Sequence, residues 1–147
     1  MGFNSRINRD LLIGWFPNLA ADAEFKLTSP STPVYNCIAW AMGFTDRWVD
    51  HFIAPGHWWP KGVQRDDTCQ SLFDAFVALG FEPTDVYDYD SNYDKVMLYG
   101  YQGRWKHAAR ILEHNIEHSK FGECWDVAIT SFKMMSMEQH TLACNAL

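Results

Sequence analysis

The spacing of hydrophobic residues predicts one clear helix in the first half of the chain. Between positions 69 and 79 apolar residues recur every three or four positions, as they do on the buried face of an amphipathic helix. Asp67 or Thr68 can cap this helix at its start, and Gly80 ends it. A shorter helix is predicted over 35–42, with Gly43 as its stop. The apolar face of the longer helix comprises Leu72, Phe73, Phe76 and Val77.

The second half of the chain changes to the alternating pattern that is typical of β-strands. Gln102 and Gly103 form a turn between the first two of these segments, and a further turn is expected over 113–115. Helices followed by an antiparallel meander predict the α+β class. The four predicted strands are KVMLYGY (95–101), KHAARIL (106–112), IEHSKFG (116–122) and CWDVAITSF (124–132).

The remaining segments give weaker patterns. A short helix is predicted near 19–25, ahead of Pro30. The segment 44–63 is rich in aromatic residues and is expected to be an irregular loop. His140 lies near the C-terminal end and is expected to belong to a frayed terminus.

Composition favours a single folded domain spanning 1–147. The chain has 147 residues, of which 48% are hydrophobic and 16% aromatic, which is enough for one core and unlike a disordered sequence. No internal repeat, low-complexity tract or long linker divides it. Cys37, Cys69, Cys124 and Cys144 form no Cys-x-x-Cys pair, so neither a metal site nor another cofactor is expected.

Charge and hydropathy exclude some classes of partner. Twelve Lys and Arg residues against eighteen Asp and Glu residues give a formal net charge of −6, without a basic run that could follow a phosphate backbone. Nucleic acid is therefore not expected as a partner. No segment reaches the roughly eighteen apolar residues of a membrane span, and the first residues lack the pattern of a secretory signal. We expect a soluble cytoplasmic protein that does not associate with membranes.

Cys37 is the cysteine whose position indicates chemistry. It lies at the start of the shorter predicted helix, where unpaired backbone N–H groups favour a thiolate over a thiol. The alternative is a small buried core residue, since cysteine is among the most buried residue types. A nucleophilic thiol also needs a base, normally histidine, within hydrogen-bond reach. Six histidines compete for that role, and His107 opens a predicted strand at the edge of a turn.

Several blocks of the chain together resemble a known family. YNCIAWAMG, WWP, KVMLYG, HAAR and SKFG are similar to the blocks of an uncharacterised bacterial family with a Tyr-Asn-Cys-Ile-Ala-Trp-Ala motif, over about 16–127. A cysteine on a leading helix and a histidine on a following antiparallel strand resemble the papain-like superfamily of cysteine peptidases, amidases, transglutaminases and deamidases. The resemblance implies a single papain-like domain, with Cys37 as nucleophile and His107 as general base.

The resemblance leaves the third catalytic residue open. Asp126 matches the acidic position of an Asp-Ile pair in the family pattern, and a carboxylate orients an imidazolium well. Ser119 and Glu123 are alternatives, because the predicted hairpin returns 119–123 toward His107. The family pattern carries a histidine shortly after the Asp-Ile pair, whereas this chain has Ala128.

Three further residues are predicted to bind substrate. Asn36 can supply an oxyanion donor beside the Cys37 backbone N–H, although a capping role explains it equally well. Trp58 and Trp59 can wall a cleft that grips an extended peptide or protein substrate, whereas dense aromatic residues are more often part of a core.

The sequence therefore predicts a papain-like cysteine hydrolase that acts on an amide bond without a cofactor. Thiolate attack forms an acyl-enzyme, which water then hydrolyses. Peptidase, amidase and Gln or Asn deamidase activities are not separated by the sequence, and a toxin or effector domain delivered into a target cell is compatible with each. The alternative is a non-catalytic binding module that retains the fold.

Overall fold

The structure is a computed structural model that describes residues 10, 26–27, 33–86, 88–113, 116–120, 126–130 and 138–145. The short helix predicted near 19–25 lies outside these residues. The described elements are two helices and nine strands in an α+β arrangement, as the sequence predicted. None of the helices in the described part of the chain has the length and apolar character needed to cross a bilayer.

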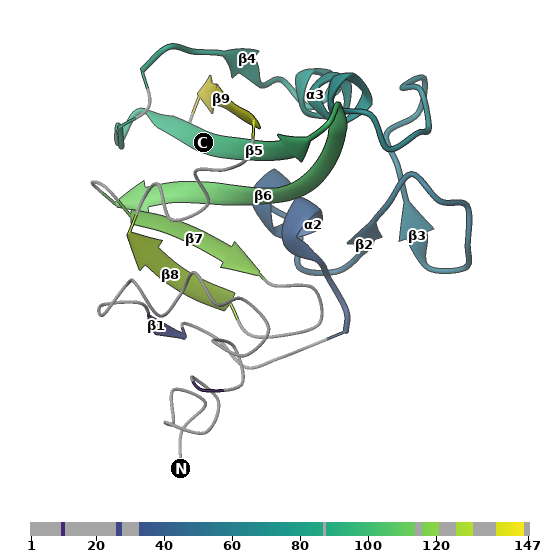
Figure 1. Ribbon diagram of the computed structural model, residues 1–147, viewed down its shortest axis with the longest axis horizontal. Coiled ribbons are helices and arrows are strands. Elements are labelled where there is room, and N and C mark those ends of the chain that lie inside the picture. Colours follow the sequence, from purple (N-terminus) through teal and green to yellow (C-terminus); the bar gives the residue numbers. More distant parts are fainter. Residues whose placement is uncertain are drawn as a thin grey trace.

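A seven-stranded sheet forms the frame, with every neighbouring pair antiparallel. Its spatial order is β1-β8-β7-β6-β5-β9-β4, so the predicted meander β5 to β8 occupies consecutive positions (Figure 1). The strands are β1 (Lys26–Leu27), β4 (Glu82–Pro83), β5 (Tyr93–Tyr101), β6 (Arg104–Glu113), β7 (Ile116–Lys120), β8 (Asp126–Thr130) and β9 (Glu138–Asn145). The turn between β5 and β6 forms at Gln102 and Gly103, which have φ angles of 52° and 78°.

The strand β9 corrects the expectation of a frayed C-terminal end. It pairs with β5 from Tyr93↔Asn145 to Gly100↔Glu138, and β4 closes its other edge. Leu142 in β9 is fully buried in the core, and His140 pairs with Leu98 through the backbone. This segment is therefore an inner strand of the sheet, because it is paired along both edges, with β5 and with β4.

The helix α2 (Cys37–Met42) starts two residues later than predicted. The side chain of Asn36 accepts a hydrogen bond from the Ala39 backbone N–H at 3.0 Å, which makes Asn36 the N-cap. Gly43 ends the helix with a φ of 95°, a left-handed conformation that glycine adopts without strain.

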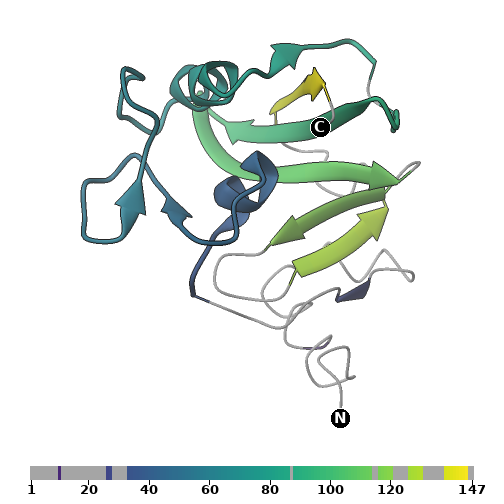
Figure 2. The same cartoon turned by 180° about the vertical axis from the view of Figure 1, so that it is seen from behind.

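The helix α3 (Cys69–Ala78) agrees with the predicted amphipathic segment. Thr68 is its N-cap and accepts from the Ser71 backbone N–H at 3.2 Å. The helices lie on the same side of the sheet, with α2 on β6 and β7 and α3 on β6 (Figures 1 and 2). The aromatic segment 44–63 is more ordered than predicted, since it contains the short parallel pair β2 (Trp48–Val49) and β3 (His57–Trp58).

The sheet carries a separate hydrophobic cluster on each face. The larger cluster joins both helices to one face, and Cys37 belongs to it. Its strand members are Val96, Leu98, Ala108 and Leu142. The smaller cluster consists of Met97, Tyr99 and Ala109. Since successive side chains of a strand point to opposite faces, the two clusters lie on opposite sides of the sheet.

Candidate functional site

Cys37 is the first residue of α2 and packs into the main core. Its exposed fraction is 9%, and its neighbours in the cluster come from both the helices and the sheet. The prediction that Cys37 begins a helix is confirmed. The thiol is nevertheless more enclosed than a nucleophile in an open groove.

His107 lies on the opposite face of the sheet from Cys37. It pairs with Tyr99 across β5 and β6, and the two rings have centroids 6.1 Å apart. Directly opposed residues of an antiparallel pair share a face, so His107 belongs with Tyr99 and Ala109. Ala108, the next residue along, is the one that packs in the Cys37 cluster. The structure does not bring Cys37 and His107 together.

Burial also changes the acid–base chemistry of His107. The side chain is 6% exposed, and desolvation lowers the pKa of His107 from 6.5 to about 4. A charged imidazolium is costly in such surroundings. His107 is therefore neutral at pH 7 and a poor partner for a thiolate.

Two of the three candidates for the third catalytic residue, Asp126 and Ser119, belong to the last two strands of the meander. Asp126 begins β8, where its backbone pairs with Lys120, and Ser119 pairs with Val127. The side chains of Asp126 and Ser119, and the whole of Glu123, lie outside the described part of the structure. Their roles stay predictions from the resemblance.

Asn36 has a structural role that accounts for its whole side chain. It is 5% exposed, its Nδ2 donates to the Val49 carbonyl at 2.6 Å, and its Oδ1 accepts from the backbone N–H groups of Val49 and Ala39. The amide therefore ties the start of α2 to β2, which agrees with the capping interpretation.

Trp58 and Trp59 differ in their surroundings. Trp59 is 5% exposed, and its Nε1 donates to the Gln64 carbonyl at 3.1 Å, so its ring is part of the core. Trp58 is half-buried, meets Phe44 edge to face at 5.4 Å, and lies 5.1 Å from the Arg47 guanidinium. Only Trp58 retains a surface that a substrate could reach.

A groove of about 660 Å³ borders the start of α2. Pro33 and Val34, just ahead of Cys37, form one part of its lining, and Asp50 and His57 form another. The Arg47 guanidinium, which also lines the groove, stacks on the Phe44 ring at 4.1 Å and pairs with Asp46 at 2.9 Å. Most of the lining residues are exposed, and the half-buried ones are Arg47, Trp48, Asp50 and His57, so the groove is open enough for an extended chain.

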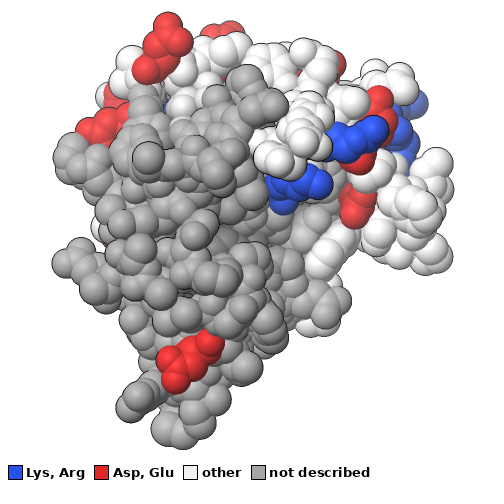
Figure 3. Space-filling view, in the orientation of Figure 1, with Lys and Arg blue, Asp and Glu red and all other residues white. Residues whose placement is uncertain are grey.

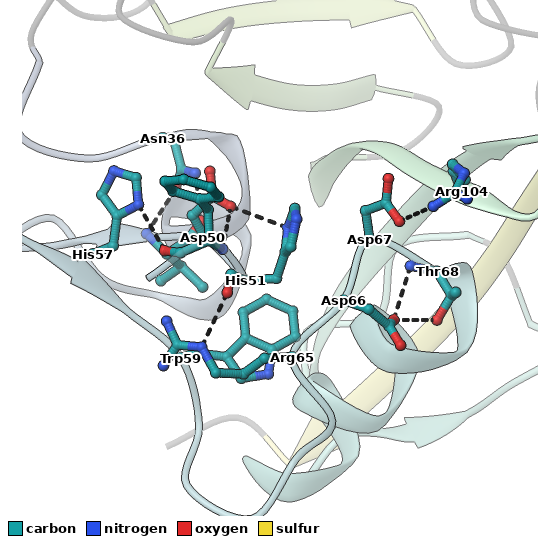
Figure 4. A network of polar contacts seen from close by, with 12 residues as sticks. Asn36, Asp50, His51, His57, Trp59, Arg65, Asp66, Asp67, Thr68 and Arg104 are labelled. Atoms are coloured by element: carbon teal, nitrogen blue, oxygen red, sulfur yellow. Dashed lines mark hydrogen bonds and ion pairs between the residues drawn. The ribbon is translucent and has the colours of Figure 1, made fainter. Parts of the chain in front are cut away.

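A polar network beside this groove was not predicted from the sequence (Figure 4). The Asp50 carboxylate lies 3.1 Å from Nδ1 of His51, and the Arg65 Nε donates to the His51 carbonyl at 3.0 Å. Beyond His51, hydrogen bonds from Ser71 and Thr68 lower the pKa of Asp66 to about 2, with a smaller effect of the His51 charge. An aspartate directly before a histidine was the feature of the sequence that could have indicated this pair.

Charges on the surface are mixed. Figure 3 shows Lys and Arg side chains close to Asp and Glu side chains on one face, rather than in a continuous basic strip. Arg104, for example, pairs with Asp67. Within the described residues, no group of three or more His, Cys, Asp or Glu side chains is placed to hold a metal ion.

Comparison with protein families matches residues 26–140 to a domain of unknown function, DUF7689. The match covers the sheet strands β1 to β8, both helices and the groove. No curated protein and no solved structure gives a significant match to the chain.

Proposed function

Because the chain belongs to the DUF7689 family, whose description assigns no activity, we propose a function from its own residues: a cysteine-dependent hydrolase of an amide bond. Cys37 Sγ is the proposed nucleophile. The observation that carries the proposal is the position of Cys37, at the first residue of α2 and beside a groove that begins at Pro33 and Val34.

The order of the elements supports the more specific proposal that this hydrolase is papain-like. A helix that begins with the cysteine precedes an antiparallel meander and packs against it. Backbone N–H groups at the start of a helix favour a thiolate over a thiol. In this proposal the Cys37 backbone N–H stabilises negative charge on a substrate oxygen, while the Ala39 N–H is already bonded to the Asn36 side chain.

The proposed reaction has two steps. The sulfur of Cys37 attacks the amide carbonyl, an S–C bond forms, and the amine leaves with a proton supplied by an imidazolium. Water then attacks the thioester, releases the carboxylic acid and restores the thiol. A peptide or protein substrate supplies the amide, from its backbone or from a Gln or Asn side chain.

A second candidate is a binding module without turnover. Its supporting observation is that Cys37 is 9% exposed within a hydrophobic cluster, with His107 on the other face of the sheet. In that case the groove lined by Trp48 and His57 would hold a partner, and the thiol would serve only packing.

A comparison of wild type with Cys37→Ala and Cys69→Ala tests the two candidates. Each protein is incubated with a peptide library and a protein extract, and new N-termini and deamidated Gln or Asn residues are identified by mass spectrometry. The hydrolase predicts products with wild type and Cys69→Ala that disappear with Cys37→Ala. Identical products in all three samples would leave the binding module as the better description.

A further inference from the structure

The proposed hydrolase needs an imidazole on the same side of the sheet as Cys37, and His51 meets that requirement. Nδ1 of His51 lies 3.1 Å from the Asp50 carboxylate in an ion-pair contact whose angles fall short of a hydrogen bond, and the ring is 29% exposed. With Nδ1 facing the carboxylate, Nε2 is the nitrogen left to exchange a proton. General-base catalysis by histidine requires this arrangement: a carboxylate orients one ring nitrogen, and the other ring nitrogen accepts and donates the proton.

Two contacts place His51 at the Cys37 end of α2. First, the Asn36 side chain both donates to and accepts from the Val49 backbone, which joins the residue before Cys37 to the residue before Asp50. Second, the His51 ring meets the Trp105 ring edge to face, with centroids 5.8 Å apart. Trp105 packs against the hydrophobic cluster that contains Cys37.

The groove provides a third connection. Asp50 lines it together with Val34, which lies three residues before Cys37. A chain in this groove passes the Asp50 carboxylate, which contacts His51, and the segment that leads into α2. The strand register places His107 on the other face of the sheet, where its ring lies against Tyr99.

We infer that His51, oriented by Asp50, is the general base and acid that acts with Cys37, and that His107 is a structural residue. This inference rests on the proposed hydrolase function. Asp50 is a positioning residue, since it acts through the imidazole, and His51 is the catalytic residue that exchanges protons with the reacting atoms.

The proton balance of the reaction follows from this assignment. Nε2 of His51 takes the proton from Cys37 Sγ as the S–C bond forms, and it gives that proton to the amine as the C–N bond breaks. In the second step Nε2 takes a proton from the attacking water and returns it to the sulfur when the acid leaves. No oxidant, metal ion or other co-reactant is consumed.

Two carboxylates lie near His51. Asp50 contacts the ring directly, and Asp66 interacts with it electrostatically across the network. Hydrogen bonds from Ser71 and Thr68 keep Asp66 ionised well below pH 7. Arg65 opposes these carboxylates, although its guanidinium donates to the His51 backbone carbonyl instead of the ring.

The rate of Cys37 alkylation by iodoacetamide, measured between pH 5 and 9, tests the assignment without knowledge of the substrate. Mass spectrometry identifies Cys37 among the four cysteines. The variants are His51→Gln, Asp50→Asn and His107→Gln, with His118→Gln, a histidine of β7 that does not line the groove, as a matched control. Circular dichroism verifies that each variant is folded.

For wild type we expect alkylation of Cys37 at pH 6.5 that is faster than that of a small-molecule thiol. His51→Gln should slow it at least about tenfold, because the thiolate loses its proton acceptor. Asp50→Asn keeps the imidazole and should shift the pH profile of alkylation to higher pH. His107→Gln and His118→Gln should stay within about twofold of wild type.

Two different failures are distinguishable. Fast alkylation in wild type that persists in His51→Gln, or that slows in His107→Gln instead, would overturn the role of His51 and leave the hydrolase standing. Alkylation in wild type no faster than that of the small-molecule thiol would remove the basis of the hydrolase, and with it this assignment.

Discussion

Acid should destabilise the protein through His107, and the size of the effect follows from its burial. Desolvation lowers the pKa of His107 to about 4 in the folded state, against 6.5 for an exposed histidine. Between these values the unfolded chain binds the proton and the folded chain does not, so the free energy of unfolding falls as the pH falls. The free energy of unfolding therefore has its full value, as far as His107 is concerned, above pH 6.5. It falls progressively as the pH is lowered from 6.5 to about 4.

The full loss is worth about 3 kcal/mol, since each pKa unit corresponds to 1.36 kcal/mol. At pH 5 about 2 kcal/mol of it should already be lost relative to pH 8. A loss of this size is a large fraction of the 5–15 kcal/mol that typically separates folded from unfolded proteins.

Urea unfolding of wild type and His107→Gln at pH 8 and pH 5 measures the effect. Other groups titrate in the same range, but they are common to both proteins, so the difference between the two pH dependences isolates His107. We expect wild type to lose about 2 kcal/mol more than the variant. Equal losses would show that His107 does not titrate with a lowered pKa, and an NMR titration of its ring protons would verify this directly.

Four substitutions test the packing and capping interactions by urea unfolding at pH 8. Asn36→Ala removes the cap of α2 and the hydrogen bonds to β2, and should lower the free energy of unfolding by about 2–3 kcal/mol. An unchanged free energy of unfolding would show that these hydrogen bonds do not stabilise the fold. Thr68→Ala removes the cap of α3 and the hydrogen bond from its hydroxyl to Asp66, and should lower the free energy of unfolding by about 1–2 kcal/mol. Lys95→Met should cost about 2 kcal/mol, because the buried ammonium donates to two loop carbonyls at 2.7 and 2.8 Å. Leu142→Ala should cost about 2–5 kcal/mol if β9 is an inner strand, and under 1 kcal/mol if that end is frayed.

Local patterns predicted the longest elements. The helix α3 follows from its periodicity, because it buries one face against the core. The strands β5 and β6 were also predicted, and both are buried on the two faces of the sheet. The strand β9 was missed because its pairing partner, β5, is about forty residues earlier and no local pattern records such pairing. The pair β2 and β3 was missed because two-residue strands are too short for periodicity to indicate.

The candidate site was predicted less completely than the fold. The start of α2 at Cys37 follows from local capping by Asn36. The Asp50–His51 pair depends on contacts with Trp105 and Arg65, which are distant in sequence, so the loop pattern alone gave no reason to prefer it. The burial of Trp59 likewise depends on tertiary packing.

The face that each residue of β6 presents is decided by one irregularity in the sheet. Tyr99 pairs with His107, whereas the adjacent Gly100 pairs with Trp105, so Lys106 is an extra residue in β6. Without this bulge the alternation would place Trp105 on the same face as His107, away from the helices. With it, Trp105 turns toward the core cluster and meets His51. The bulge therefore decides which face of the sheet carries Trp105, and through the contact between the two rings it places His51 on the side of the sheet that carries the core cluster.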